Sequence, residues 1–469
     1  MHLSRIRLWN FRRFGSSADF DLDKPNLDLS LKNGLNVLVG ENDSGKSAII
    51  DAIRRVLGTH SLDWNWVTDD DFYRDSTRLR IELTFEGMAD EEAKNFIEWL
   101  GWTGEGENIK TYLCLNYDWR RNLERIFPSE VRAGADREGS PLSAEAREYL
   151  KSTYLRPLRD AQGELVPKRN SRISRIFQGH PAFKGKEDNH HLVTLFKGFN
   201  KGIENYFEGK DSEGKDLPDD QGKKLKKEVD SFVQAFCSDE KSTEIGVTEG
   251  SLKSVLERLI LSIKDEMNPG LGTLNRLFMA AELVHLSKKD WHGLRLGLIE
   301  ELEAHLHPQA QMQVIEELQK QTDIQLILTT HSPNLTSKIK LESLIICNCN
   351  RAFPMGKDFT KLDEADYKFL ECFLDVTKSN LFFAKGVIMV EGWAEELLIP
   401  ALAKKMKASG MIQRDLTEAG VSVVNVGGTA FLRYSKIFLR NSTPIMGIPV
   451  AIVTDIDVPE YEIGIGGSG

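Results

Sequence analysis

The chain has 469 residues, enough for about three domains, and its 41% hydrophobic content is sufficient for sizeable buried cores. A formal net charge of -10 at pH 7 excludes a globally basic nucleic-acid-binding protein, so contact with nucleic acid would have to come from local patches. There is no signal-peptide core, no apolar run near the ~20 residues that span a bilayer, and only sparse cysteines, which together predict a cytoplasmic protein without membrane segments.

The N-terminal residues predict a strand followed by a phosphate-binding loop. Basic and apolar residues alternate from His2 to Phe14, which is typical of an edge strand. Residues 40–47 fit the pattern G-x-x-x-x-G-K-[ST] at every fixed position, between an expected strand at 35–39 and an expected helix at 48–53. Backbone N–H groups and the helix dipole of such a loop bind phosphate oxygens. We therefore expect ATP at Gly40, Asn42, Gly45, Lys46 and Ser47, with Lys46 on the β- and γ-phosphates and Ser47 on Mg²⁺.

The middle of the chain changes character twice. Strict alternation at 79–85 and 111–117 predicts an antiparallel sheet beside the nucleotide-binding core. From 143 to 266 the chain is rich in Lys, Glu and Asp and has helical apolar spacing, which predicts a mainly helical insertion. Two basic stretches within it, 168–175 and 223–227, have two interpretations: a solvated helix face or a contact with a phosphate backbone.

The nucleotide-binding pattern resumes after the insertion. Residues 294–299 predict a buried strand that ends in Glu300 and Glu301. A carboxylate at such a strand end beside a phosphate loop can hold Mg²⁺, and the next one can polarise the attacking water. We assign Glu300 to the metal and Glu301 to the water. A further buried strand at 325–330 ends at His331, which we expect to contact the γ-phosphate, although a structural histidine is the alternative.

Acidic residues follow the strands expected near the C-terminus, at 386–390, 421–426 and 449–454. The carboxyl ends of parallel strands meet at one edge of a sheet, where ligands bind. Such carboxylates suit Mg²⁺ or Mn²⁺ and support phosphodiester cleavage by metal-activated water. The predicted metal ligands are Glu391, Glu395, Asp455 and Asp457, and the predicted catalytic residues are Glu301, His331, Glu391, Asp455 and Asp457. The alternative is an ordinary α/β domain with acidic loop ends.

These motifs together resemble two known modules. Residues 5–14, the phosphate loop, 299–308 and 329–332 are similar to an ABC-type ATPase head of the RecF, SMC and overcoming-lysogenization-defect (OLD) group. The acidic C-terminal segment resembles a Toprim domain, and the order of head and Toprim is that of the OLD family. In such heads a signature segment from a second head reaches the γ-phosphate. The candidate here is 270–276, with Gly272 and Asn275 as nucleotide contacts, although it lacks the usual serine.

The resemblance implies an α/β fold: an ABC-type P-loop ATPase head with a mainly helical insertion, followed by a Rossmann-like Toprim domain. We expect the head at 1–142 and 267–380, a dimerising insertion at 143–266, and the Toprim domain at 381–469. Because the chain ends at Gly469, soon after Asp457, we expect that Toprim domain to be incomplete.

The implied function is that of an ATP-hydrolysing, Mg²⁺- or Mn²⁺-dependent DNA endonuclease that acts in defence against phage. The expected partners are DNA and further copies of the chain in a homodimer or larger homo-oligomer, with room for a companion defence protein. The alternative is a RecF- or SMC-like ATPase clamp or sensor with a non-catalytic Toprim remnant. The four Toprim carboxylates favour the nuclease, because a non-catalytic remnant has no chemical reason to keep them.

Overall fold

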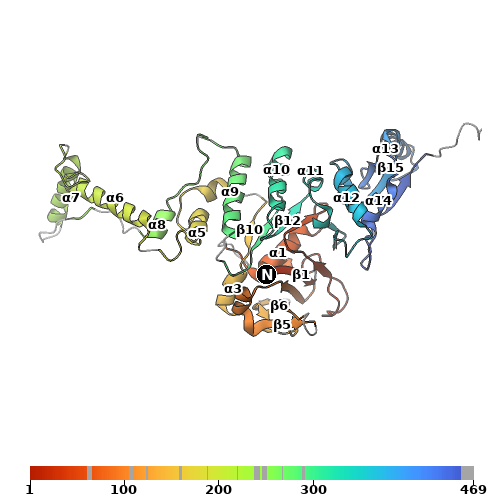
Figure 1. Cartoon of the computed structure of the whole chain (residues 1–469), viewed down its shortest axis with the longest axis horizontal. Helices are drawn as coiled ribbons and strands as arrows, with labels where there is room; N and C mark the ends of the chain where they lie inside the picture. The colour runs from red at the N-terminus through yellow and green to blue at the C-terminus, as the bar shows by residue number, and fades with distance from the viewer. Residues whose placement is uncertain are drawn as a thin grey trace, which may run out of the picture. The chain divides into compact units, whose positions relative to one another are not determined.

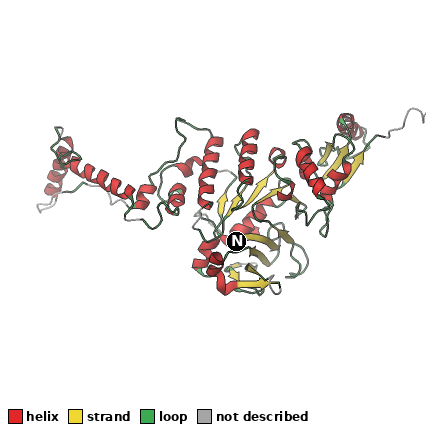
Figure 2. Ribbon diagram, in the orientation of Figure 1, coloured by secondary structure: helices red, strands yellow, loops and turns green. Residues whose placement is uncertain are grey.

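The computed structural model describes residues 1–60, 66–104, 109–122, 125–157, 161–186, 189–218, 220–236, 243–245, 251–266, 268–287 and 291–455. The chain divides into two compact units, one formed by 1–159 with 292–469 and the other by 160–291. Figure 1 labels their elements in chain order, and Figure 2 shows which are helices and which are strands. The predicted Asp457 lies outside the described residues.

An antiparallel sheet forms one layer of the first unit. Its main path runs β2-β1-β4-β6-β8-β9, and β5 and β7 pair with β6. The strands are β1 (His2–Trp9), β2 (Leu27–Ser30), β4 (Arg78–Glu86), β5 (Leu100–Thr103), β6 (Lys110–Arg121), β7 (Ile126–Phe127), β8 (Arg132–Ala133) and β9 (Ser140–Pro141). The expectation of an edge strand at His2 was wrong, because β1 lies between β2 and β4. The partner β2 alternates apolar and polar residues but has only four residues, too few to be identified from sequence.

A second, mostly parallel sheet carries the phosphate loop. Its order is β10-β11-β12-β3-β13-β14, and only β13 and β14 run antiparallel to each other. The strands are β3 (Leu35–Val39), β10 (Thr153–Leu155), β11 (Leu296–Ile299), β12 (Gln325–Thr330), β13 (Leu344–Asn348) and β14 (Arg351–Pro354). Every residue of β3, β11 and β12 is buried, as expected of parallel strands covered on both faces. The three buried strands predicted from the sequence are thus confirmed.

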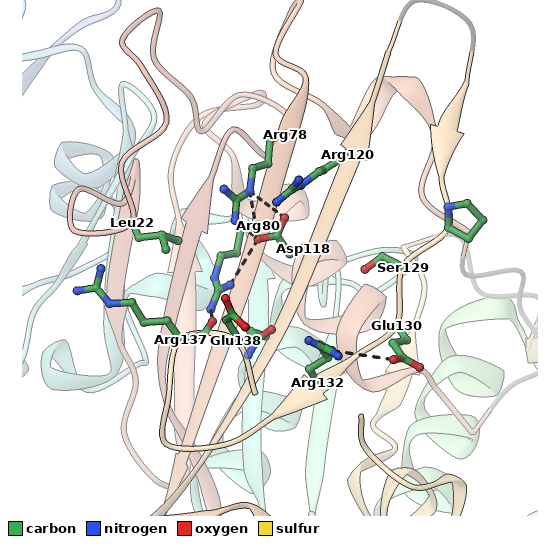
Figure 3. Close-up of a pocket in the computed structure, with 12 residues that line it drawn as sticks. Leu22, Arg78, Arg80, Asp118, Arg120, Ser129, Glu130, Arg132, Arg137 and Glu138 are labelled. Carbon is green, nitrogen blue, oxygen red and sulfur yellow. Dashed lines mark hydrogen bonds and ion pairs between the residues drawn. The ribbon is translucent and has the colours of Figure 1, made fainter. Parts of the chain in front are cut away.

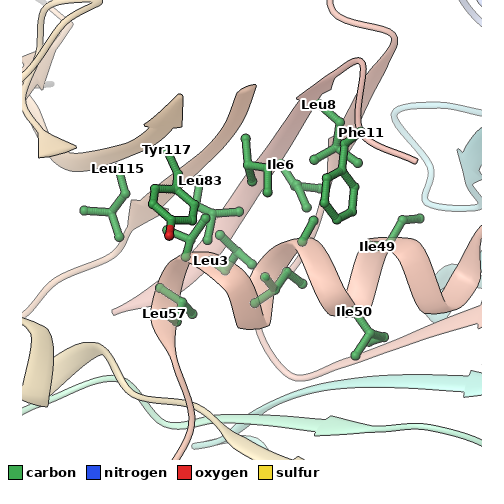
Figure 4. Packing of buried hydrophobic residues seen from close by; sticks show 14 of the residues in the cluster. Leu3, Ile6, Leu8, Phe11, Ile49, Ile50, Leu57, Leu83, Leu115 and Tyr117 are labelled. Atoms are coloured by element: carbon green, nitrogen blue, oxygen red, sulfur yellow. The ribbon is translucent and has the colours of Figure 1, made fainter. Parts of the chain in front are cut away.

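The helix after the phosphate loop, α1 (Lys46–Leu57), packs against the antiparallel sheet. Ile49 and Ile50 are fully buried in one cluster with Leu3, Ile6 and Leu83. Figure 4 shows the strand side chains pointing toward α1. Each such side chain stabilises the fold by about 1.5–3 kcal/mol through burial. This packing fixes the helix whose N-terminus faces the phosphate loop.

The remaining helices of the first unit vary in length from four to sixteen residues. They are α2 (Asp90–Ala93), α3 (Ala144–Leu150), α10 (Pro308–Gln319), α11 (Pro333–Thr336), α12 (Glu364–Phe373), α13 (Trp393–Ala408) and α14 (Phe431–Ser435). The C-terminal sheet has the order β16-β15-β17, with β15 (Gly386–Val390), β16 (Val421–Asn425) and β17 (Val450–Val453) all parallel. The three parallel strands predicted there are confirmed.

The second unit is helical in its described parts. It contains α4 (Ala161–Leu165), α5 (Arg172–Gln178), α6 (His191–Phe207), α7 (Gln221–Phe236), α8 (Leu252–Leu256) and α9 (Leu271–Leu286). Val193, Leu252 and Leu256 form a small core. Its range of 160–291 begins and ends later than the predicted insertion of 143–266. The start differs because β10 joins the ATPase sheet, and a three-residue strand carries no readable periodicity.

None of the described helices is long and apolar enough to cross a membrane.

Candidate functional site

Two glycines shape the phosphate loop between β3 and α1. Gly40 has φ +149° and Gly45 has φ +104°, which side-chain-bearing residues rarely adopt. A Cβ at Gly40 would lie 2.3 Å from the carbonyl oxygen of Cys347, and one at Gly45 would lie 2.7 Å from the Phe14 ring. Glycine is therefore required at both positions, and the backbone stays open to a close ligand.

Lys46 is buried within this loop. Its Nζ donates to the carbonyl oxygens of Gly40 at 2.7 Å and Glu41 at 2.6 Å. Burial lowers the pKa of Lys46, while the negative charge of Glu303 and Glu301 acts in the opposite direction. The ammonium is thus held at the loop by weak neutral acceptors, which charged phosphate oxygens would outcompete.

Ser47 and Glu300 meet although they are distant in sequence. Ser47 Oγ donates to Glu300 Oε2 at 3.1 Å, and the Ser47 side chain remains exposed. The pairing follows from the sheet, because β11, β12 and β3 are adjacent parallel strands and Glu300 ends β11. The hydroxyl and carboxylate oxygens are the ligand types that Mg²⁺ prefers. The predicted metal pair therefore has the geometry and chemistry to fit the ion.

Tyr154 of β10 holds the other oxygen of Glu300. Its hydroxyl donates to Glu300 Oε1 at 3.2 Å, and the Arg54 guanidinium lies 3.7 Å from its ring centroid. Burial, and then the Glu300 carboxylate, raise the pKa of Tyr154, so the hydroxyl remains a donor at neutral pH. Burial also raises the pKa of Glu300, as does nearby Asp51, while the hydrogen bonds from Ser47 and Tyr154 oppose that shift.

Glu301 sits in a strained turn just after β11. Its φ is +44°, an uncommon value for a residue other than glycine. The turn is fixed by a hydrogen bond of 3.0 Å from the Glu301 N–H to Thr329 Oγ1. Its side chain is exposed. This placement leaves the carboxylate accessible to water, as the predicted role requires.

His331, at the end of β12, is paired with Glu303. Its Nδ1 lies 3.0 Å from Glu303 Oε1, and its backbone N–H donates to the same oxygen at 2.7 Å. The His331 side chain is 47% exposed, whereas that of Glu303 is 9% exposed. Glu303 Oε2 is buried without a hydrogen-bond partner among the described residues. Glu303 therefore orients His331 and retains one unused acceptor.

The C-terminal sheet brings Glu391 to the end of β17. Thr454 Oγ1 donates to Glu391 Oε2 at 2.6 Å, and Asp455 follows Thr454 in an exposed position. The N–H of Gly428 donates to the carbonyl oxygen of Glu391 at 3.0 Å. The carboxyl ends of the three strands thus meet around Glu391.

Glu395, another of the predicted C-terminal metal ligands, also caps a helix. Glu395 Oε2 accepts a hydrogen bond of 3.0 Å from the N–H of Gly392 and so caps α13. Within the described part of the chain, no three His, Cys, Asp or Glu side chains form a cluster ready to hold a metal ion. The four-carboxylate site remains a prediction, since Asp457 lies outside the described residues.

The predicted signature segment begins α9 in the second unit. Gly272 is in the first turn of this helix, which is capped by Gly270. Asn275 is 1% exposed, so its side chain faces the interior of the unit. A contact between Asn275 and a nucleotide would require this helix to rearrange.

Family models match both modules. The model of the AAA ATPase domain matches residues 1–245 and 186–336, and that of the overcoming lysogenization defect protein-like Toprim domain matches 382–457. The chain belongs to the AAA ATPase domain family, and its C-terminal part is a Toprim domain of the overcoming lysogenization defect (OLD) protein-like type. The predicted fold class and the predicted enzyme class, an ATPase head followed by a Toprim nuclease domain, are confirmed at the level of the family.

Two curated relatives carry nuclease names. The OLD nuclease of Thermus scotoductus is 24% identical over 97% of this chain and 82% of its own length. The endonuclease GajA of Bacillus cereus is 26% identical over 40% of this chain, and the match spans 31% of GajA. Among solved structures, an Smc head bound to the C-winged helix domain of ScpA matches 74% of this chain and 94% of its own, at 15% identity and a TM-score of 0.42.

Three side chains at these sites were not predicted from the sequence. Tyr154 and Glu303 support Glu300 and His331, and Asn425 donates to Glu396 Oε2 at 3.2 Å at the end of β16. Glu303 lies four residues after the strand predicted at 294–299, and Asn425 is the last but one residue of the strand predicted at 421–426, so closeness to a strand end is a signal that could have found them. Tyr154 had no such signal, because it lies in the range assigned to the insertion.

Proposed function

We propose that the chain binds and hydrolyses ATP at the phosphate loop and couples this to metal-dependent cleavage of DNA at the Toprim edge. The observation that carries the proposal is the hydrogen bond of 3.1 Å between Ser47 and Glu300, two residues whose types and positions were predicted as a metal pair. A divalent cation held there would neutralise charge on the β- and γ-phosphates.

The residues of the ATPase head have different roles in ATP hydrolysis. Lys46 binds the phosphates, and Ser47 with Glu300 holds the cation. Glu301, exposed in its strained turn, orients water toward the γ-phosphate, and His331 is held by Glu303 at the neighbouring strand end. Each of these side chains comes after the carboxyl end of a parallel strand, either in the following turn or at the start of α1, where α/β sheets bind ligands.

The Toprim edge supplies the second reaction. Glu391 and Asp455 would hold Mg²⁺ or Mn²⁺ through carboxylate oxygens, with Glu395 and Asp457 extending the set. A cation there would stabilise charge on the scissile phosphate. The names of the OLD nuclease and the endonuclease GajA support cleavage of a nucleic acid as the activity. DNA as the substrate and defence against phage as the setting are part of our proposal.

The test separates the two sites by mutation. Glu301→Gln should retain ATP and lose turnover, whereas Glu391→Ala and Asp455→Ala should lose plasmid cleavage in Mg²⁺ or Mn²⁺ and keep ATP hydrolysis. Asp323→Asn, an exposed loop substitution, is the matched control. Hydrolysis by Glu301→Gln at the parent rate, or undiminished cutting by both alanine variants, would contradict the assignment.

A second candidate is an ATPase clamp or sensor on DNA whose Toprim domain does not cut. The observation in its favour is that the described carboxylates do not form a preassembled metal cluster and that Glu395 caps a helix. Salt-sensitive DNA binding without cleavage under every metal tested would favour this candidate.

We further propose that the chain acts in the cytoplasm as a homodimer or larger homo-oligomer, with DNA and a companion defence protein as partners. Support for the oligomer comes from the exposed apolar stripes of α6 and α7, described in the Discussion.

A further inference from the structure

One face of the antiparallel sheet is lined with arginine. Because side chains alternate along a strand, Leu79 and Ile81 of β4 face α1, whereas Arg78 and Arg80 face the other way. On the neighbouring strand β6, Leu115 and Tyr117 face α1, and Asn116, which lies between them, faces the arginines. The arginine face is therefore on the side of the sheet away from α1.

A cavity of about 980 Å³ lies on this face. Figure 3 shows Arg78, Arg80 and Arg120 close together on adjacent strands, with Arg132 on a further strand and Arg137 in the loop before β9. The arginines that line it are Arg78, Arg80, Arg120, Arg132 and Arg137, and the carboxylates are Asp118, Glu130 and Glu138. Its volume matches that of ordinary small-molecule sites, about 300–1,000 Å³. The lining has a surplus of positive charge.

Part of this charge is internally paired. Arg78 binds Asp118 through two nitrogens, at 2.9 and 2.5 Å, and Arg80 donates to the carbonyl oxygen of Arg137 at 2.7 Å. By contrast, Arg120 is exposed and forms no ion pair with any described residue. Arg132 is 3.9 Å from Glu130, at the limit of an ion pair. Two cations at the rim thus remain available to a ligand.

Two buried donors line the same cavity without acceptors. Arg80 is 3% exposed and Asn116 is 2% exposed. Arg80 Nε and Asn116 Nδ2 have no hydrogen-bond partner among the described residues. An unsatisfied buried donor costs about 1–3 kcal/mol, and a bound acceptor removes that cost. Burial also lowers the pKa of Arg80, which indicates that neighbouring carboxylates do not fully compensate its charge.

We propose that this arginine-lined cavity is a second phosphate-binding site, on the face of the antiparallel sheet away from α1. Its ligand is a nucleotide-sized phosphate ester, either a free nucleotide or the phosphorylated 5′ end of a nucleic-acid strand. Arg120 and Arg132 engage the phosphate at the rim, and Asn116 and Arg80 provide donors deeper inside. Because the Asn116 and Arg80 donors lie inside the cavity, a terminal phosphate can reach them, whereas the phosphates along the side of a duplex cannot enter.

Binding is tested in the full chain carrying Lys46→Ala, which removes nucleotide from the phosphate loop. The probes are ADP, a 5′-phosphorylated deoxydecanucleotide and the same strand with a 5′-hydroxyl, titrated by calorimetry. Adding Arg120→Ala with Arg132→Ala should weaken binding of ADP or of the phosphorylated strand by about tenfold or more for each lost charged contact. Arg5→Ala, on β1 and outside the cavity, should leave binding unchanged.

A second variant separates binding from folding. Asn116→Leu removes an unsatisfied buried donor. It should therefore weaken ligand binding and leave the midpoint of thermal unfolding unchanged or higher. Binding of ADP alone identifies a free nucleotide as the ligand, and preference for the phosphorylated strand identifies a nucleic-acid end. The proposal is overturned if neither ADP nor the phosphorylated strand binds, if the two strands bind with the same measurable affinity, or if Arg5→Ala weakens binding as much as the double substitution does.

Discussion

At the scale of single residues, the ATPase site depends on one carboxylate shared by two hydroxyl groups. Ser47 and Tyr154 each donate to a different oxygen of Glu300. Such bonds restrict the carboxylate to one orientation, because rotation would break both. Only Ser47 belongs to the recognisable loop motif, yet Tyr154 determines where the second oxygen points. We therefore regard Tyr154 as a positioning residue.

Tyr154→Phe should raise the Mg²⁺ concentration needed for half-maximal ATP hydrolysis by about tenfold, since a hydrogen bond to a charged carboxylate contributes about 1.5 kcal/mol or more. The phenyl ring retains the stacking with Arg54, so the fold should persist. Steady-state rates over a Mg²⁺ titration measure this, and excess Mg²⁺ should restore most of kcat. Tyr112→Phe, on β6, is the matched control. An unchanged Mg²⁺ requirement would show that Tyr154 does not position Glu300.

At the scale of elements, α5 and α9 are joined by a buried ion pair. Arg172 Nε lies 2.6 Å and Nη2 lies 2.7 Å from the two oxygens of Glu282, and the side chains are 7% and 4% exposed. Arg172 belongs to the basic stretch 168–175, which we had expected to be a solvated face or a phosphate contact. For Arg172 both interpretations were wrong, because the side chain is buried in this ion pair. Its partner lies 110 residues away in the sequence, so no local pattern reveals the pair.

Glu282→Leu alone should destabilise the second unit by about 3–5 kcal/mol, because it leaves the Arg172 charge buried without its carboxylate. The double variant Arg172→Met with Glu282→Leu should recover most of this loss, since an apolar pair of similar volume replaces the ion pair. Urea unfolding followed by hydrogen exchange in α5 and α9 measures both. Equal losses in the single and double variants would contradict this account.

A second element-scale prediction concerns the turn before the 3₁₀ helix η5 (Lys378–Phe383). Burial acts to raise the pKa of Asp375, but hydrogen bonds from Lys378 and Thr377 outweigh it and bring the pKa to about 2, from 3.8. The ionised carboxylate therefore stabilises the folded state above pH 3.8, and this contribution is lost as the pH falls toward 2.

Asp375→Asn should lower the free energy of unfolding at neutral pH by less than about 1 kcal/mol, because the side chain is 53% exposed and solvent screens its ion pair. The difference from the parent should shrink between pH 4 and pH 3. Urea titrations at pH 7, 5, 4 and 3 measure it, with Asp323→Asn as the control. A difference in unfolding free energy that stays constant or grows as the pH falls would contradict this prediction.

The elements that could be predicted from sequence are those whose pattern is local. Residues 35–39 and 386–390 are apolar runs bounded by polar or glycine residues, and they form β3 and β15 with those bounds. β10 could not be predicted, because three residues show no period and their partner β11 is more than 140 residues away. The same distance explains why the position of Glu300 after a buried strand could be predicted, whereas its partner Tyr154 was missed.

At the scale of the whole molecule, the second unit presents apolar surface that its own core does not use. Leu195 and Phe199 of α6 are 56% and 59% exposed and are four residues apart, so they share a helix face. Phe232 of α7 is 63% exposed. The apolar helical stripes predicted for the insertion are thus present, and several of their large side chains are exposed to solvent in one chain. Contiguous exposed apolar surface of this kind marks sites of protein association.

We predict that a second copy of the chain covers this surface in solution. Sedimentation velocity at micromolar concentration should show a dimer or larger species for the parent. Leu195→Ser with Phe199→Ser should shift it toward monomer by at least about tenfold in the dissociation constant, because each change removes roughly 1.5–3 kcal/mol of apolar burial across the interface. Both side chains are exposed within the chain, so the variant should keep the thermal stability of the isolated unit.

Lys201→Ser, on the polar face of α6, is the matched control and should sediment like the parent. A parent that stays monomeric with ATP and Mg²⁺, or a double variant that still dimerises, would place the oligomeric contact elsewhere.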